Sequence, residues 1–206
     1  MSDWVDRQLR GRGIADERVL EAMRRVPREL FVPLAERVHA YDDSALPIGY
    51  GQTISQPYVV ALTCSALRLR GHERVLDVGT GSGYQAAVLA QLAASVVGVE
   101  RIPELAAAAR RNLAAAALDV EVLEGDGSNG VPDRAPFDAI AVAAAAHELP
   151  AALVEQLAPE GRMVIPLRDE LVLVTPGPEV RTLGPVRFVP LVTGFPDAAE
   201  GTDGGA

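Results

Sequence analysis

The segment that decides the fold reads Val75-Leu76-Asp77-Val78-Gly79-Thr80-Gly81-Ser82-Gly83. A short apolar run ends in alternating glycines, and a helix-forming segment follows from Tyr84 to Leu92. This order predicts a strand, a tight turn and the start of a helix. Glycines at alternate positions let the backbone turn sharply, and without a Cβ a ligand can approach the backbone amides. We predict that the turn is a ligand-binding loop.

The spacing of the glycines indicates the class of ligand. It is Gly-x-Gly-x-Gly, whereas dinucleotide sites use Gly-x-Gly-x-x-Gly to receive a pyrophosphate at a helix N-terminus. Tyr84 stands where the third glycine of that fingerprint would be. The loop therefore favours a nucleoside ligand without phosphates, for which S-adenosylmethionine is the candidate. A tight strand-to-helix connection that binds nothing is the alternative.

Strand-like and helix-like segments alternate on the C-terminal side of Arg74. Alternation of this kind predicts an α/β fold with a doubly wound, mostly parallel sheet that is buried on both faces. The predicted parallel strands are Val75–Val78, Val96–Val99, Val120–Leu123, Phe137–Val142 and Met163–Pro166. Three shorter runs separated by Pro and Gly predict antiparallel strands that finish the sheet. These runs are Leu171–Thr175, Val180–Leu183 and Val186–Leu191.

The N-terminal part of the chain predicts a helical cap followed by a functional loop. Asp16 is a plausible N-cap for a helix over Glu17–Arg25, and Pro57 suits the first turn of a helix that ends at Leu67. Between them, residues 41–57 form a long irregular stretch that is rich in hydroxyl, amide and glycine groups, which is typical of a functional loop. We expect a single domain over residues 1–195. Within it, residues 1–57 form the cap and loop, residues 74–195 form the sheet, and residues 196–206 are a flexible acidic tail.

Composition excludes several classes of function. The net charge of −9 argues against a nucleic-acid-binding face, and no apolar run is long enough for a membrane span. The one cysteine, Cys64, rules out an internal disulfide and fits a reducing compartment, so we expect a cytoplasmic protein with a buried, inert thiol. His39, His72 and His147 lie far apart, so no metal site is expected. No apolar stripe calls for a partner, so a monomer is the expectation.

Acidic residues follow three successive predicted strands. Asp77 ends the first, Glu100 the second and Asp126 the third. Ligands of a doubly wound sheet bind at the carboxyl ends of its strands, and an acid about 20 residues beyond the glycine turn is placed to accept from ribose hydroxyls. Asp126, between two glycines, could accept from an adenine amino group. Each acid alone could be a solvated loop residue, but three in succession favour a ligand site.

Ser55 is the candidate that could orient a substrate. It stands two residues before Pro57, where its hydroxyl could cap the following helix. Capping and substrate binding are compatible, so both roles are kept.

Several motifs taken together resemble the protein-L-isoaspartate O-methyltransferases, which are Rossmann-like S-adenosylmethionine-dependent methyltransferases. The similarity covers residues 26–191, and its most specific element is Gln52-Thr53-Ile54-Ser55-Gln56-Pro57. The glycine turn is shared with many other methyltransferases. The remaining motifs are Val99-Glu100-Arg101-Ile102-Pro103-Glu104-Leu105, Gly125-Asp126-Gly127, Ala135-Pro136-Phe137-Asp138-Ala139-Ile140 and Val186-Arg187-Phe188-Val189-Pro190-Leu191.

The resemblance implies roles for individual residues. Ser55 matches the active-site serine of the family. The other implied residues contact the methyl donor: Gln52, Thr53 and Ile54 around the site, Gly79 at its methionine part, Glu100 at its ribose, and Asp126 and Gly127 at its adenine. Asp77, Gly81 and Arg101 complete the expected donor-binding set.

The resemblance also implies a reaction. A methyl group passes from S-adenosylmethionine to the free carboxylate of L-isoaspartyl residues in damaged proteins, and the ester leads through a succinimide to repair. A related carboxyl methyltransferase that acts on a dedicated aspartate-containing peptide, or on another carboxylate, is the alternative, since His147 replaces a usual proline. Tyr84 in the glycine loop disfavours a nicotinamide-dependent oxidoreductase. A binding module that keeps the fold but has lost catalysis is a further alternative. The presence of Ser55, Glu100 and Asp126 gives it no support.

Overall fold

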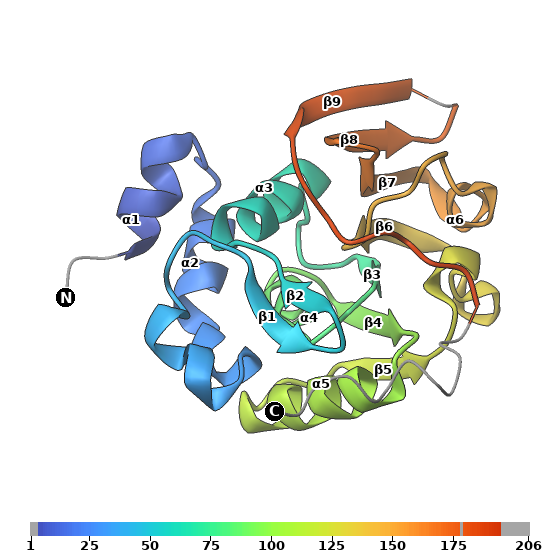
Figure 1. Ribbon diagram of the computed structural model, residues 1–206. Coiled ribbons are helices and arrows are strands. Elements are labelled where there is room, and N and C mark those ends of the chain that lie inside the picture. The colour runs from blue at the N-terminus through green and yellow to red at the C-terminus, as the bar shows by residue number, and fades with distance from the viewer. Residues whose placement is uncertain (1–3, 178, 195–206) are drawn as a thin grey trace.

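The centre of the molecule is a seven-stranded sheet with the strand order β5-β4-β3-β6-β7-β8-β9 (Figure 1). The computed structural model describes residues 4–177 and 179–194, so the expected tail over residues 196–206 lies outside the described residues. The strands are β3 (Arg74–Val78), β4 (Ser95–Glu100), β5 (Glu121–Glu124), β6 (Phe137–Val142), β7 (Leu157–Leu167), β8 (Glu170–Thr175) and β9 (Glu179–Pro185).

Strand direction confirms the doubly wound fold. The five strands β5, β4, β3, β6 and β7 are parallel, whereas β8 and β9 run antiparallel to their neighbours. The chain goes from β3 outward to β4 and β5, then returns to place β6 on the other side of β3. The strand order therefore reverses between β3 and β6, which is where folds of this kind bind their ligands.

Helices and apolar side chains bury both faces of the sheet. One core joins residues of α2, α3, α4 and α5, and a second core contains Leu153 of α6 together with side chains from β3, β6 and β7. Burial on both sides explains why the strands read as continuous apolar runs rather than as alternating ones. The helices are α1 (Trp4–Gln8), α2 (Glu17–Arg25), α3 (Pro57–Leu67), α4 (Tyr84–Ala90), α5 (Pro103–Ala115) and α6 (Ala151–Glu155). Short 3-10 helices are η1 (Arg10–Arg12), η2 (Arg28–Phe31), η3 (Leu34–His39), η4 (Gly127–Asn129) and η5 (Pro132–Arg134).

The N-terminal cap packs on the helical layer through α2, which contacts α3 and α4. The side chain of Asp16 accepts from the amides of Arg18 and Val19, so Asp16 is the N-cap that the sequence predicts. The Arg18 guanidinium donates to the carbonyls of Leu69 at 2.5 Å and Leu92 at 3.2 Å, at the ends of the segments that follow α3 and α4. These bonds fix the cap against the rest of the domain.

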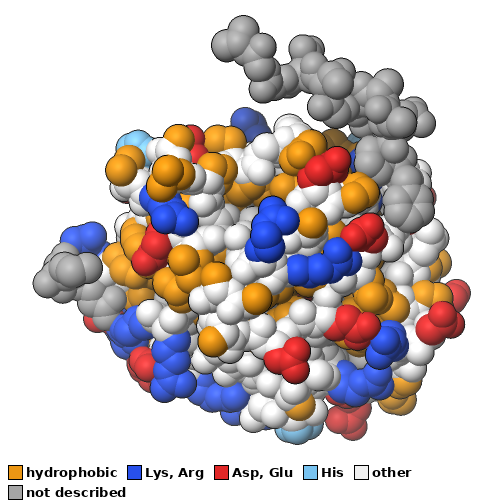
Figure 2. Space-filling view, turned by 90° about the horizontal axis from the view of Figure 1, so that it is seen from below, with side chains coloured by type: hydrophobic (Ala, Val, Ile, Leu, Met, Phe, Trp, Pro, Cys, Tyr) orange, Lys and Arg blue, Asp and Glu red, His pale blue; other side chains and the backbone are white. Residues whose placement is uncertain are grey.

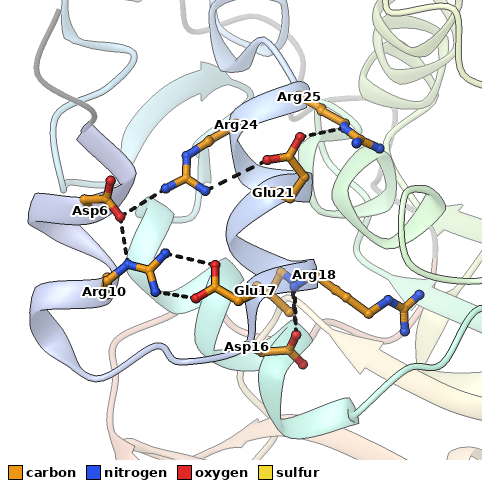
Figure 3. Close-up of polar contacts among 9 residues, drawn as sticks. Asp6, Arg10, Asp16, Glu17, Arg18, Glu21, Arg24 and Arg25 are labelled. Carbon is orange, nitrogen blue, oxygen red and sulfur yellow. Dashed lines mark hydrogen bonds and ion pairs between the residues drawn. The ribbon is translucent and has the colours of Figure 1, made fainter.

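Ion pairs hold the first helices of the cap together (Figure 3). Arg10 lies between Asp6, at 2.8 Å, and Glu17, and Arg24 reaches the same Asp6 carboxylate at 3.0 Å. All of these side chains are partly exposed, so each pair contributes little to stability, with typical values below about 1 kcal/mol. Their effect is to orient α1 and η1 on α2.

The predicted irregular stretch is partly regular. Residues 41–57 include a hairpin of β1 (Leu46–Gly49) and β2 (Gln52–Ile54), paired antiparallel. Its turn uses left-handed backbone at Tyr50, with φ of 55°, and at Gly51, with φ of 67°. The expectation of an irregular loop over this whole stretch is therefore wrong. Gly49 and Gly51 permit a tight turn between two short strands.

The last predicted strand, Val186–Leu191, is absent. The chain leaves β9 and crosses in front of the sheet, and Pro190 makes only an isolated bridge with Ala145 beyond β6 (Figure 1). Proline has no amide hydrogen, so this segment cannot continue a ladder of hydrogen bonds. We call residues 186–194 the strap.

Candidate active site

A cavity lies at the carboxyl ends of β3, β4 and β6, next to the point where the strand order reverses. Four segments form most of its wall: the β1–β2 hairpin with residues 52–55, the glycine loop, the end of β4 through Ile102, and residues 189–192 of the strap. The remaining wall comes from Val60, Val78, Tyr84, Gln85, Gly127, Ala143 and Ala144. Segments that are far apart in the sequence thus meet around one space.

The glycine loop sits close to β4. The amides of Gly79 and Thr80 both donate to the carbonyl of Val99, at 2.9 and 3.2 Å. A Cβ at Gly98 would come within 2.4 Å of Thr80 Oγ1, so only glycine at position 98 lets the loop lie this low. Gly81 has φ of 56°, and a Cβ there would stand 3.2 Å from Ile48 Cδ1 across the cavity. The glycine loop therefore forms a cradle of bare backbone at the cavity, and side chains added at its glycines would narrow the cavity.

Asp77 lies beneath the loop and does not line the cavity. Its carboxylate is fully buried and accepts from Thr80 Oγ1 at 2.9 Å and from Gln85 Nε2 at 2.8 Å. Both of those partners do line the cavity. The structure therefore places Asp77 behind the cavity wall, where it holds Thr80 and Gln85, which are in the wall, and its contact with the donor stays a prediction.

Burial raises the pKa of Asp77 to about 6, although its hydrogen bonds from Gln85 and Thr80 oppose the rise. The folded chain therefore keeps a proton on this carboxyl at pH values where the unfolded chain has lost it. Its contribution to the free energy of unfolding is then largest below about pH 4 and falls as the pH rises to about 6.

We expect Asp77→Asn to remove this decline. From pH values well below 4 to pH values well above 6, the parent protein should lose up to roughly 3 kcal/mol of unfolding free energy relative to the variant, because one pKa unit corresponds to about 1.4 kcal/mol. Urea unfolding at several pH values measures the difference. Parallel curves for the two proteins would show that Asp77 keeps its ordinary pKa.

Glu100 ties the glycine loop to the start of α5. It is 5% exposed, and its two carboxylate oxygens accept from the amides of Gly81 at 2.8 Å and Ile102 at 3.0 Å. The side chain lines the cavity at the end of β4, as the sequence predicts. Each carboxylate oxygen can accept a second bond, so Glu100 has capacity for ligand hydroxyls.

Asp126 is outside the cavity wall, whereas Gly127 lines it. One oxygen of Asp126 accepts from the amide and hydroxyl of Ser128, at 2.9 and 2.6 Å. The other accepts from Asn129 Nδ2 at 3.1 Å and from the Gly194 amide at 2.6 Å. A carboxylate has about four acceptor positions, and all four are used. The expected bond to an adenine amino group would have to displace one of these donors.

The hairpin brings Gln52, Thr53, Ile54 and Ser55 to the cavity together. Ser55 is half-buried there and does not cap α3, whose N-cap is Gln56 with no side-chain bond. The capping role that the sequence allowed for Ser55 is therefore wrong. What remains for Ser55 is its place in the cavity wall.

Of the eleven candidate site residues, the structure brings nine to the cavity and places Asp77 and Asp126 behind it. Sequence reasoning missed the strap, whose residues 189–192 form a wall of their own. A signal was present in the Val186–Leu191 motif, but its apolar character indicated a strand. It also missed Gln85, which follows the glycine turn and reaches Asp77.

Other candidate groups lie apart from the cavity. Cys64 is a buried free thiol on α3, and burial raises its pKa well above the usual value, so it is not a nucleophile. His39 pairs with Asp42 on the surface. Among residues 4–177 and 179–194 there is no group of three His, Cys, Asp or Glu side chains that could hold a metal ion. No helix in this part of the chain is long and apolar enough to cross a membrane.

Comparison with known proteins assigns the fold and cavity to a family. The family model described as protein-L-isoaspartate(D-aspartate) O-methyltransferase matches residues 3–195. The chain belongs to this family. A curated protein-L-isoaspartate O-methyltransferase from Methanoculleus marisnigri is 54% identical over 202 residues, which cover 94% of this chain and 91% of that protein. Protein-L-isoaspartate O-methyltransferase 2 from Marinobacter nauticus is 57% identical over 195 residues, covering 90% and 89%.

Solved structures agree with the family assignment. A putative protein-L-isoaspartate O-methyltransferase from Plasmodium falciparum, in complex with S-adenosyl-L-homocysteine, is 27% identical with a TM-score of 0.80. The match covers 91% of this chain and 96% of that one. As a member of the family, the chain is an O-methyltransferase of isoaspartyl residues that uses S-adenosylmethionine. The glycine cradle and the buried Glu100 carboxylate fit such a donor, since one admits a ligand close to backbone and the other accepts from hydroxyls.

Proposed function

We propose that this cavity positions the carboxylate of an L-isoaspartyl residue in a damaged polypeptide for methylation, and that the ester returns through a succinimide toward normal aspartate. The observation that carries the proposal is the meeting of Ser55 with the glycine loop and Glu100 in one cavity. When bound, S-adenosylmethionine supplies an electrophilic methyl group on a positively charged sulfur. The chain itself has to hold the two reactants in line and keep water out.

The position of each residue supports the donor-binding role that we propose for it. Gly79 and Gly81 form the cradle for the methionine part, Glu100 accepts from the ribose hydroxyls, and Gly127 offers its backbone to the adenine. Gln52, Thr53, Ile54 and Arg101 complete the wall around the donor. Asp77 and Asp126 act from behind the wall. Asp77 acts through Thr80 and Gln85, and Asp126 acts through the strap.

The site needs no general base. A carboxylate is already ionised at neutral pH, so no proton has to leave before the oxygen attacks. This fits the described cavity wall, in which there is no histidine and the one acidic side chain, Glu100, is occupied by two backbone amides. Ser55 donates its hydroxyl hydrogen to one oxygen of the isoaspartyl carboxylate, which leaves the other oxygen to attack the methyl carbon.

Repair after methyl transfer requires no further group of the enzyme. The neighbouring backbone nitrogen of the substrate attacks the ester carbonyl and forms the C–N bond of a succinimide, while the methoxy group leaves and takes up the amide proton as methanol. An ionised carboxylate has no comparable leaving group. Water then opens the ring at either carbonyl and returns part of the product as normal aspartate. The enzyme's task ends with release of the ester.

Two synthetic peptides that differ only by L-isoaspartate or L-aspartate at one position test the proposal. With labelled S-adenosylmethionine, the isoaspartyl peptide should be labelled and the aspartyl peptide should not, and the label should leave as methanol on standing. Absence of label on both, with S-adenosyl-L-homocysteine still bound, would assign the chain to the specialised relatives that methylate another carboxylate.

Charge and cysteine usage support a proposal about partners and compartment. We infer that polypeptide substrates, rather than nucleic acids, occupy the enzyme, because the chain carries a net charge of −9. On the face shown in Figure 2, acidic side chains lie among the basic ones, including at the lower left edge where basic side chains are most frequent. We propose that the protein is a monomer and that it works in the cytoplasm, where its one thiol stays reduced.

A further inference from the structure

The strap closes one side of the donor cavity. Its first residue, Val186, donates from its amide to the Asp169 carbonyl at 2.9 Å, and two further points hold the strap beside the cavity. The first is Ala145, beyond β6, whose amide donates to the Val189 carbonyl and whose carbonyl accepts from the Leu191 amide, both at 2.8 Å. Residues 189–192, which line the cavity, lie at and just beyond this anchor.

The second point is Gly194, which is bound by two charged side chains. Its amide donates to Asp126 Oδ2 at 2.6 Å, and its carbonyl accepts from Arg101 Nε at 3.1 Å. Arg101 directly follows β4 and Asp126 lies just beyond β5, so the strap is pinned to two strand ends at the proposed nucleoside side of the cavity.

The chemistry of this second point differs from that of the first. Both of its bonds are exposed to solvent, so water can replace them without unfolding the sheet. Partial burial alone would raise the pKa of Asp126, but the hydrogen bonds from Gly194 and Ser128, together with the charge of Arg101, hold it below its usual value. Asp126 is therefore charged throughout the neutral range, and the bonds at this point are charge-assisted.

We propose that Asp126 and Arg101 form a latch on Gly194 that keeps the strap over the donor cavity, and that the donor enters and leaves only while this latch is open. The proposal rests on the donor site proposed above. The two side chains are positioning residues in this role, since they act on the donor through the strap. The full set of acceptor positions on Asp126 agrees with a carboxylate committed to holding the chain in place.

Gly194→Ala tests the latch without altering a charged group or the cavity wall. Gly194 has φ of 78°, a backbone conformation that disfavours alanine, and a Cβ there would meet nothing within 4 Å. The variant should weaken the closed strap whether or not the donor is bound. We therefore expect the association and dissociation rate constants of S-adenosyl-L-homocysteine both to rise about fivefold, with Kd changed less than about twofold.

Gly177→Ala is the matched control. Gly177 lies in the turn between β8 and β9 and has φ of 105°, and a Cβ there would likewise meet nothing within 4 Å, so the variant also places alanine on positive-φ backbone, away from the strap. Both rate constants should equal those of the parent chain. Surface plasmon resonance on the immobilised full chain measures the rates.

An unchanged association rate in Gly194→Ala would overturn the latch. If the strap only contacts the bound donor and does not block its entry, Gly194→Ala would raise the dissociation rate constant alone. Kd would then rise as well, which is a different pattern. Failure of the parent chain to bind S-adenosyl-L-homocysteine would instead overturn the donor site on which the latch depends, so the two failures are distinguishable.

Discussion

Ser55→Ala is expected to lower kcat for an isoaspartyl peptide by about 100-fold, a typical loss for one hydrogen-bond donor that acts at the reacting groups. Kd for S-adenosyl-L-homocysteine should stay within about twofold. The reason is that the hydroxyl lies in the cavity wall with no role in capping α3, so its removal leaves the fold and the donor cradle intact. Initial rates and calorimetric titration measure the two quantities.

Ser65→Ala is the control for that experiment. Ser65 lies on the same helix that follows Ser55, and its hydroxyl is buried without a hydrogen-bond partner and outside the cavity wall. Its removal should leave kcat unchanged. If folded Ser55→Ala turned over at the parental rate, Ser55 would have no part in the mechanism.

Glu100→Ala is expected to weaken S-adenosyl-L-homocysteine binding by about 100-fold, or roughly 2.7 kcal/mol. The truncation removes the acceptor for the ribose and leaves the amides of Gly81 and Ile102 without their carboxylate partners. The glycine cradle then loses the bond that holds Gly81 toward β4. Calorimetric titration of the variant gives the affinity, and thermal unfolding gives the accompanying loss of stability.

Glu124→Ala is the control for Glu100→Ala, because it removes a different acidic side chain at the end of a strand. Glu124 ends the adjacent strand β5 and is 43% exposed in an ion pair with Arg110 at 2.7 Å. An exposed pair of this kind contributes little, so donor affinity should change less than about twofold. Equal affinities of Glu100→Ala and the parent chain would remove Glu100 from the donor site.

The order of elements was predictable because it depends on neighbours along the chain. Apolar runs of strand length, the proline at the start of α3 and the Asp16 cap each act within a few residues, and the parallel strands, α2 and α3 appear where their local patterns place them. The ends of the elements were less certain: β5 spans Glu121–Glu124 rather than the predicted Val120–Leu123. The same local logic predicted Glu100 at a strand end and the cradle formed by the glycines.

The positions of Asp77 and Asp126 relative to the cavity were not predictable in this way. Both follow the pattern of strand-end acids, yet Asp77 is turned beneath the loop and Asp126 is bound by the strap. Whether an acid faces a ligand or a neighbouring loop depends on which other donors reach it. Those donors include Gly194, 68 residues away from Asp126 in the sequence.

By itself the sequence determined the doubly wound sheet, the family and the set of segments that meet at the carboxyl ends of the strands. Periodicity and turn chemistry are local, and the resemblance rests on motifs that are local too. Only the tertiary structure decided that Val186–Leu191 is a strap instead of a strand and that two of the acids stand behind the cavity wall. Those outcomes depend on which donors and acceptors distant segments bring together, and no local pattern records that.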